Sequence, residues 1–87
     1  MTLDQIKQLQ KENGLDEMQK LIDCGEVWKM EGSMGRNAMQ LLELGACMLP
    51  EEDYQDFYGN MIPSRNRLKP GTKGTFDNSV NYWKGFL

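Results

Sequence analysis

Glycine and proline divide this chain of 87 residues into short segments, and the longest segment without either is residues 1–13. Within these segments apolar residues recur at spacings of three and four, which is typical of one face of a helix. Because glycine and proline end helices, each segment can hold only a short one. We therefore expect a mainly all-α fold, a small compact bundle of four to five short helices that forms a single domain over residues 1–87.

Local signals predict the first two helices. Thr2 and Gln5 have the spacing of a capping box, in which a hydroxyl and an amide each satisfy a free backbone N–H. Asn13-Gly14 supplies a residue that can adopt a left-handed conformation at the end of this helix. Asp16 is a suitable N-cap for a second helix, and Gly25 is its natural stop.

Residues 26–45 are harder to assign. Val27, Trp28 and Met30 fit a helical stripe, but glycine inside a helix costs about 1 kcal/mol relative to alanine. We favour a break or kink at Gly32-Ser33, followed by a helix that ends at Gly45, although the pattern leaves open whether residues 26–45 form one helix or two.

Pro50 is well placed as the first residue of a fourth helix, because it has no N–H to leave unsatisfied. Acidic residues 51–53 would complement the helix dipole, and Gly59-Asn60 would end the element. Prolines, glycines and bases at about 60–74 predict a long ordered loop or extended arm. Thr75 is then positioned to cap a last short helix.

The residue inventory argues against metal and catalytic chemistry. The chain has two cysteines, Cys24 and Cys47, and no histidine, whereas structural zinc sites need four ligands. We expect both cysteines to be small buried hydrophobes. We predict no enzyme activity, cofactor or metal. No apolar run is long enough to span a bilayer and no signal-peptide pattern is present, so we expect a cytoplasmic protein without membrane association.

Charge is divided unevenly along the chain. Residues 1–63 carry twelve acids and five bases, a net charge of −7, whereas residues 64–87 carry five bases and one acid, a net of +4. Such an asymmetry is informative about partners rather than about fold. The predicted contact surface combines four of these bases with two aromatic residues that flank them: Arg65, Arg67, Lys69, Lys73, Tyr58 and Trp83.

Several alternatives remain open for these residues. The bases could hold phosphates while Trp83 stacks on a nucleic-acid base, or they could simply neutralise the acidic part of the chain. The glycines and lysines of residues 69–75 could cradle an anion, although Pro-Gly and Gly-Thr are also what a tight turn before a capped helix requires.

Two further patterns allow both a structural and a binding interpretation. Seven methionines are many for this length, and methionine either fills irregular core space or lines an adaptable partner groove. Residues 32–35 match the GXXG loop of KH domains, but no alternating strands accompany them, which favours a kink or a close helix contact.

Residues 24–75 carry a resemblance in four stretches, EGSMGRNAM, LELGACML, YGNMIPSR and PGTKGT. In these stretches the chain resembles small uncharacterised proteins encoded by bacteriophages. The resemblance brings no catalytic residues or cofactor. It implies a role of binding, either as an inhibitor of host defence or of a host enzyme, in an anti-CRISPR-like manner, or as a helper in nucleic-acid transactions.

These observations together predict a non-enzymatic binding protein of phage type that acts in the host cytoplasm. We expect it to inhibit or redirect a host protein or protein complex by direct contact. The alternative is a nucleic-acid-binding accessory protein that uses the basic segment on phosphates. Binding of a nucleotide at residues 69–75 and assembly into a homo-oligomer are further possibilities, the latter because the core of so short a chain is small.

Overall fold

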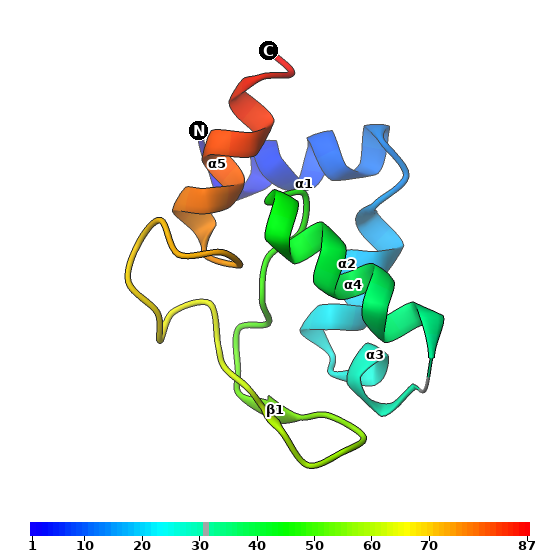
Figure 1. Cartoon of the computed structure of the whole chain (residues 1–87). Coiled ribbons are helices and arrows are strands. Elements are labelled where there is room, and N and C mark those ends of the chain that lie inside the picture. Colours follow the sequence, from blue (N-terminus) through cyan, green and yellow to red (C-terminus); the bar gives the residue numbers. More distant parts are fainter. Residues whose placement is uncertain (31) are drawn as a thin grey trace.

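The computed structural model describes residues 1–30 and 32–87, and its cartoon is shown in Figure 1. Five helices and one two-stranded hairpin make up this part of the chain. They are α1 (Leu3–Glu12), α2 (Asp16–Asp23), α3 (Glu26–Lys29), α4 (Ser33–Leu44), β1 (Tyr54–Gln55), β2 (Met61–Ile62) and α5 (Phe76–Lys84). The Cα radius of gyration is 12.1 Å, as expected for a compact domain of this length. The expected mainly all-α fold is confirmed.

Hydrogen bonds at the helix ends explain where the helices begin. Thr2 and Gln5 form both bonds of the capping box at the start of α1, with the Thr2 N–H donating to Gln5 Oε1 at 2.7 Å. The Thr75 hydroxyl accepts from the Asn78 N–H at the start of α5. These two helix starts lie where the sequence predicts them.

The segment that the sequence left open contains two helices. The chain is extended at Met30, so α3 ends at Lys29 and α4 begins only at Ser33. The favoured break near Gly32-Ser33 is therefore confirmed. At the other end of α4, Gly45 has φ 96° and its Cα lies against α5, where an added Cβ would come within 2.9 Å of the Asn78 carbonyl oxygen.

The predicted helix at residues 50–60 is wrong, because these residues enter a β-hairpin. β1 and β2 pair antiparallel, with Tyr54 opposite Ile62. The Asp53 carboxylate accepts the Ser64 N–H at 2.7 Å, and Asp56 accepts N–H groups within the hairpin turn. These side chains satisfy backbone donors outside a helix, which is how aspartate competes with helix formation. The loop and arm that follow, predicted from about residue 60, begin with β2.

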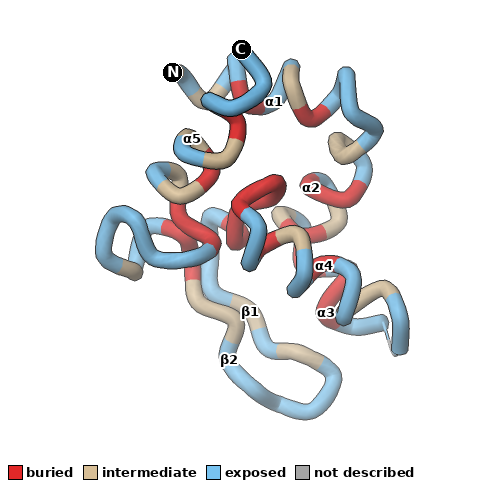
Figure 2. Tube along the Cα trace, turned by 45° about the horizontal axis from the view of Figure 1, so that its top comes forward, coloured by how far each residue is buried: buried red, intermediate tan, exposed pale blue. Residues whose placement is uncertain are grey.

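An irregular segment, residues 45–50, runs through the centre of the molecule with every residue buried (Figure 2). Side chains satisfy its backbone groups. Gln10 and Trp83 both donate to the Ala46 carbonyl, at 3.0 and 3.2 Å, while Gln19 bonds both the N–H and the carbonyl of Met48. Buried backbone without these partners would be costly, so the segment depends on α1, α2 and α5.

Residues 45–50 separate two apolar clusters. One cluster gathers around Ile22, Trp28 and Leu42 from α2, α3 and α4, and the other around Ile6 and Trp83 from α1 and α5. The segment contributes to both, through Cys47 to the first and Met48 to the second. It therefore joins the two halves of the core.

The two cysteines differ in environment. Burial raises the pKa of the Cys47 thiol to about 12, and the negative charge of Asp23 adds to the rise. Cys24 is exposed at the end of α2, so the expectation that both are buried is wrong for this residue.

No helix in the described part of the chain is long and apolar enough to cross a membrane.

Candidate protein-binding surface

A groove of about 580 Å³ lies between the α3–α4 pair and the hairpin, and its lining is mainly apolar. Figure 1 shows the hairpin extending beyond the helices at one end of the molecule. The large apolar lining residues are Trp28 and Met30 from α3 and its end, Met39 from α4, and Phe57, Tyr58 and Ile62 from the hairpin. We call these six residues the groove surface.

Four members of the groove surface are exposed although they are large and hydrophobic. The exposed fractions are 39% for Met30, 48% for Met39, 55% for Phe57 and 78% for Tyr58. The Phe57 and Tyr58 rings pack edge to face with centroids 5.3 Å apart, so the turn presents them as a pair. A cluster of exposed aromatic and methionine side chains around a groove is typical of surfaces that bind other proteins.

Asp56 holds the hairpin turn in shape. Its Oδ1 atom accepts the N–H groups of Tyr58 and Asn60 at 2.9 and 2.8 Å, and its Oδ2 atom accepts the Asn60 side chain. Burial raises the pKa of Asp56, but the hydrogen bonds from Asn60, Tyr58 and Gly59 outweigh it and hold the pKa below the ordinary value of 3.8. The charged form is therefore favoured in the folded turn.

We expect Asp56→Ala to loosen the turn, because two backbone N–H groups lose their acceptor. In the unsubstituted protein, protonation of the Asp56 carboxylate by acid weakens the same hydrogen bonds. Because the pKa of Asp56 is lower in the folded state than the unfolded value of 3.8, the charged carboxylate stabilises the fold above pH 3.8. This stabilisation is lost as the pH falls through the lowered pKa. Amide hydrogen exchange at Tyr58 and Asn60 measures both effects. The exposed neighbour Glu52→Ala is the control, and equal protection in both variants would contradict this role of Asp56.

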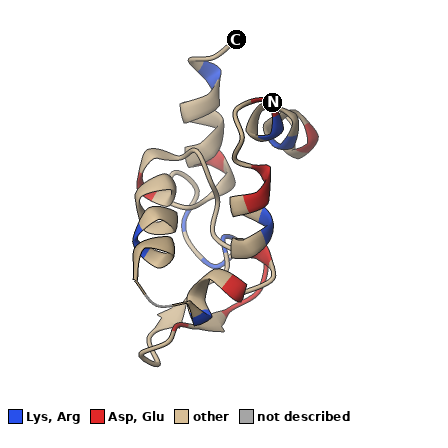
Figure 3. Cartoon of the chain, turned by 90° about the vertical axis from the view of Figure 1, so that its right-hand side faces the viewer, with Lys and Arg blue, Asp and Glu red and all other residues tan. Residues whose placement is uncertain are grey.

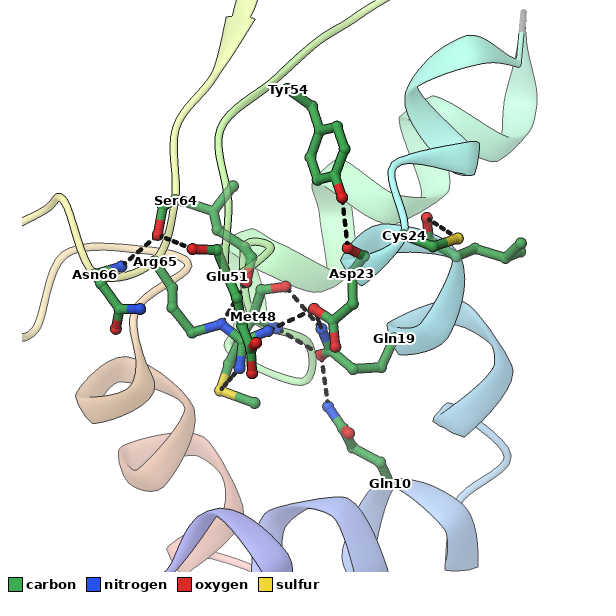
Figure 4. Close-up of polar contacts among 12 residues, drawn as sticks. Gln10, Gln19, Asp23, Cys24, Met48, Glu51, Tyr54, Ser64, Arg65 and Asn66 are labelled. Carbon is green, nitrogen blue, oxygen red and sulfur yellow. Dashed lines mark hydrogen bonds and ion pairs between the residues drawn. The ribbon is translucent and has the colours of Figure 1, made fainter.

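Two of the six predicted contact residues are buried. Arg65 is 7% exposed, and its guanidinium donates to the Asp23 carboxylate at 2.5 Å and to the Leu49 carbonyl at 2.6 Å (Figure 4). Trp83 is fully buried and packs on Tyr82 at a centroid distance of 4.9 Å. Both side chains bond residues 45–50, so the surface role predicted for them does not match their position.

The other four predicted residues lie either in the groove surface or in the loop between β2 and α5. Tyr58 lies in the groove surface, where the hairpin brings it next to Phe57. Arg67 pairs with Asp53 at 2.8 Å and its side chain is 58% exposed. Lys69 and Lys73 are exposed in the loop before α5 and have no ion pair within the described ranges. The structure therefore does not gather the six residues into one surface.

The division of charge in the sequence is partly compensated in the fold. Arg65 and Arg67 from the basic segment pair with Asp23 and Asp53 from the acidic one. In Figure 3 basic and acidic residues occur along the same elements rather than on opposite sides of the molecule. These pairs support the interpretation in which the basic segment neutralises part of the acidic segment.

Internal hydrogen bonds account for the loop that the sequence singled out as an anion cradle. The Thr75 hydroxyl accepts the Gly71 N–H at 3.2 Å and donates to the Thr72 carbonyl at 2.6 Å. The Gly74 carbonyl accepts the Leu49 N–H at 2.8 Å, and this hydrogen bond connects the loop to residues 45–50. These contacts are those of a turn that positions α5, the structural alternative considered for these residues.

Sequence reasoning missed most of the groove surface. The methionine content was the available signal, because Met30 and Met39 line the groove while Met18 and Met48 are buried in the core. Trp28 gave no signal of its own, and the helix expected at residues 50–60 hid the hairpin that carries Phe57. Within the part of the chain that the structure describes, no group of histidine, cysteine or acidic residues is arranged to hold a metal ion.

Comparison with known proteins returned no matching family model, no matching curated protein and no matching solved structure.

Proposed function

We propose that this chain is a non-enzymatic binding protein of phage type, which inhibits or redirects a host protein or protein complex through the groove surface. The single observation that carries the proposal is the exposure of Met39, Phe57 and Tyr58 around one groove. Leaving such side chains in water costs free energy that contact with a partner recovers. The resemblance to small phage proteins supplies the host context.

A protein partner fits this surface better than a small molecule. The groove volume alone suits either occupant, since ligand sites typically measure about 300–1,000 Å³. Tyr58, however, is 78% exposed at the tip of the hairpin, and Met61 nearby on β2 is 58% exposed. A small molecule within the groove could contact Tyr58 but would leave Met61 in water, whereas a protein can cover the groove, Tyr58 and Met61 together.

Capture from bacterial lysate tests the proposal. We expect Tyr58→Ser and Met39→Glu each to weaken capture of the partner by roughly 30-fold, because removing a central aromatic or apolar contact costs about 2 kcal/mol. The matched control is Lys73→Glu, which changes an exposed residue outside the groove surface. The melting temperatures of all three variants should stay within a few degrees of that of the unsubstituted protein.

The opposite pattern of binding among these variants would contradict the proposal. If Lys73→Glu abolished binding while Tyr58→Ser and Met39→Glu bound normally, the contact would belong to the basic loop. Anisotropy with labelled DNA and RNA then separates the nucleic-acid alternative. Three phosphate contacts by Lys69, Lys73 and Lys84 would give a log–log salt slope of roughly −2.7.

A further inference from the structure

A second cleft, of about 320 Å³, lies between α1 and α2 and shares no residue with the groove surface. Its lining residues are all polar or charged, and all of them come from these two helices. Two of them are buried glutamines, Gln10 at 1% and Gln19 at 4% exposure, whereas the lysines around them are exposed. The cleft therefore leads from charged surface side chains to polar groups of the core.

Hydrogen bonds fix the orientation of the Gln10 side-chain amide. Its Nε2 atom donates to Gln19 Oε1 at 2.9 Å and to the Ala46 carbonyl at 3.0 Å, and Figure 4 shows this nitrogen directed at Gln19. Gln19 is held in turn by the N–H and the carbonyl of Met48. Because the Gln10 amide cannot turn without breaking both of its bonds, the position of its Oε1 atom is fixed as well.

The Gln10 Oε1 atom accepts no hydrogen bond within the described residues. The fully buried side-chain atoms without a partner belong to Trp28, Asn78 and Ser79, so Gln10 Oε1 is not closed off in the core. The open space that Gln10 lines is the cleft, and Oε1 therefore faces it. Since nearly all acceptors at such depth in folded proteins are partnered, this atom calls for a donor from outside the chain.

The charged side chains of the cleft have both signs and do not pair across it. Asp23 is paired with Arg65, and Lys20 with Glu17. The remaining charges are two acids and two bases that form no ion pair within the described residues: Asp4, Lys7, Lys11 and Asp16. A ligand with a single charge would be repelled by two of these side chains, whereas a ligand with both charges matches all of them.

We propose that this cleft binds a small zwitterion of the free amino acid class. The ligand ammonium supplies the donor that Gln10 Oε1 lacks and lies near the carboxylate of Asp16. The ligand carboxylate accepts from Lys7 and Lys11, which lie one turn apart on α1. Known ligand sites measure about 300–1,000 Å³, so a cleft at the lower end of this range suits a molecule of this size.

The test titrates the full chain, labelled with ¹⁵N, with each common amino acid up to about 10 mM. We expect at least one polar amino acid to move the side-chain amide resonances of Gln10 and Gln19, while that of Gln55 on the exposed hairpin stays in place. Acetylation of the same amino acid removes its ammonium, and amidation removes its carboxylate. Each derivative should bind roughly fivefold more weakly, because one ionic contact is lost.

Two variants test the charged side chains of the cleft. Lys11→Gln and Asp16→Asn each remove one charge with little change in size, and each should weaken binding roughly fivefold. The matched controls are Lys29→Gln and Glu12→Gln, which make the same changes of charge at exposed positions outside the cleft. Both controls should bind as the unsubstituted protein does, and the melting temperatures show whether all four variants fold.

Two results would overturn the proposal. If no amino acid moves the Gln10 resonance at the highest concentration, the cleft holds water only. Equal affinities for the free, acetylated and amidated forms would show that the charges of the cleft do not recognise the ligand. Neither result bears on the groove surface, because the two sites have no residue in common.

Discussion

Replacing Arg65 by methionine is expected to lower the free energy of unfolding by about 3 kcal/mol. The substitution keeps most of the side-chain volume but leaves the Asp23 carboxylate and the Leu49 carbonyl without the donor that now serves both. Breaking a buried ion pair from one side typically costs about 3–5 kcal/mol, and we take the lower end because the Asp23 side chain is 30% exposed.

Thermal unfolding measures this effect directly. A loss of about 3 kcal/mol corresponds to a decrease in melting temperature of roughly 12–24 °C for a domain of this size. The matched control is Arg67→Met, which removes the ion pair with Asp53 at the surface and should cost at most about 1 kcal/mol. Equal melting temperatures for the two variants would show that Arg65 does not hold residues 45–50 in place.

Trp83→Ala is the second large effect, with an expected loss of about 4 kcal/mol. The fully buried ring fills the space between α1 and α5, and its N–H is one of two donors to the Ala46 carbonyl. Small domains have a free energy of unfolding of about 5–15 kcal/mol, so this change removes much of the total.

Urea unfolding of three variants separates the contributions of Trp83. Trp83→Phe retains most of the ring and should cost distinctly less than Trp83→Ala. Tyr58→Ala removes an aromatic ring that is 78% exposed, so we expect a change within about 0.5 kcal/mol. A near-normal unfolding midpoint for Trp83→Ala would contradict the core role of this residue and restore it as a candidate contact residue.

Local interactions made much of the helical part of this fold predictable. The capping box of Thr2 and Gln5, and the cap provided by Thr75, each involve residues three positions apart, so the pattern is visible in the sequence. The break before Ser33 follows from the low helix propensity of glycine, which is also a local property. These elements can be predicted without knowing which residues distant in the sequence they contact.

The errors arose where distant partners decide the structure. Arg65 bonds Asp23, 42 residues away, and Trp83 bonds Ala46, 37 residues away. Neither pairing leaves a pattern in the sequence, so both side chains resembled exposed contact residues. The hairpin at residues 54–62 was hidden for a similar reason, because Asp53 bonds Ser64 across the hairpin instead of supporting a helix start.

The candidate site was only partly predictable because three separate parts of the chain build it. Tyr58 was predicted as a contact residue and lies in the groove surface, and methionine content indicated an adaptable groove as one alternative. The buried indole N–H of Trp28, which has no hydrogen-bond partner in the described structure, is recognised only once burial and hydrogen-bond partners are known. The groove surface thus follows from the meeting of α3, α4 and the hairpin, which sequence patterns did not indicate.

Site-specific photocrosslinking in bacterial cells tests the central claim most directly. A photoreactive phenylalanine analogue replaces Tyr58 in one variant and exposed Lys73 in the other, so the two positions report on the groove surface and on the basic loop. We predict a covalent adduct with a host protein from position 58 and none from position 73. Protein adducts from position 73 alone, nucleic-acid adducts, or only dimers of this chain would contradict the account.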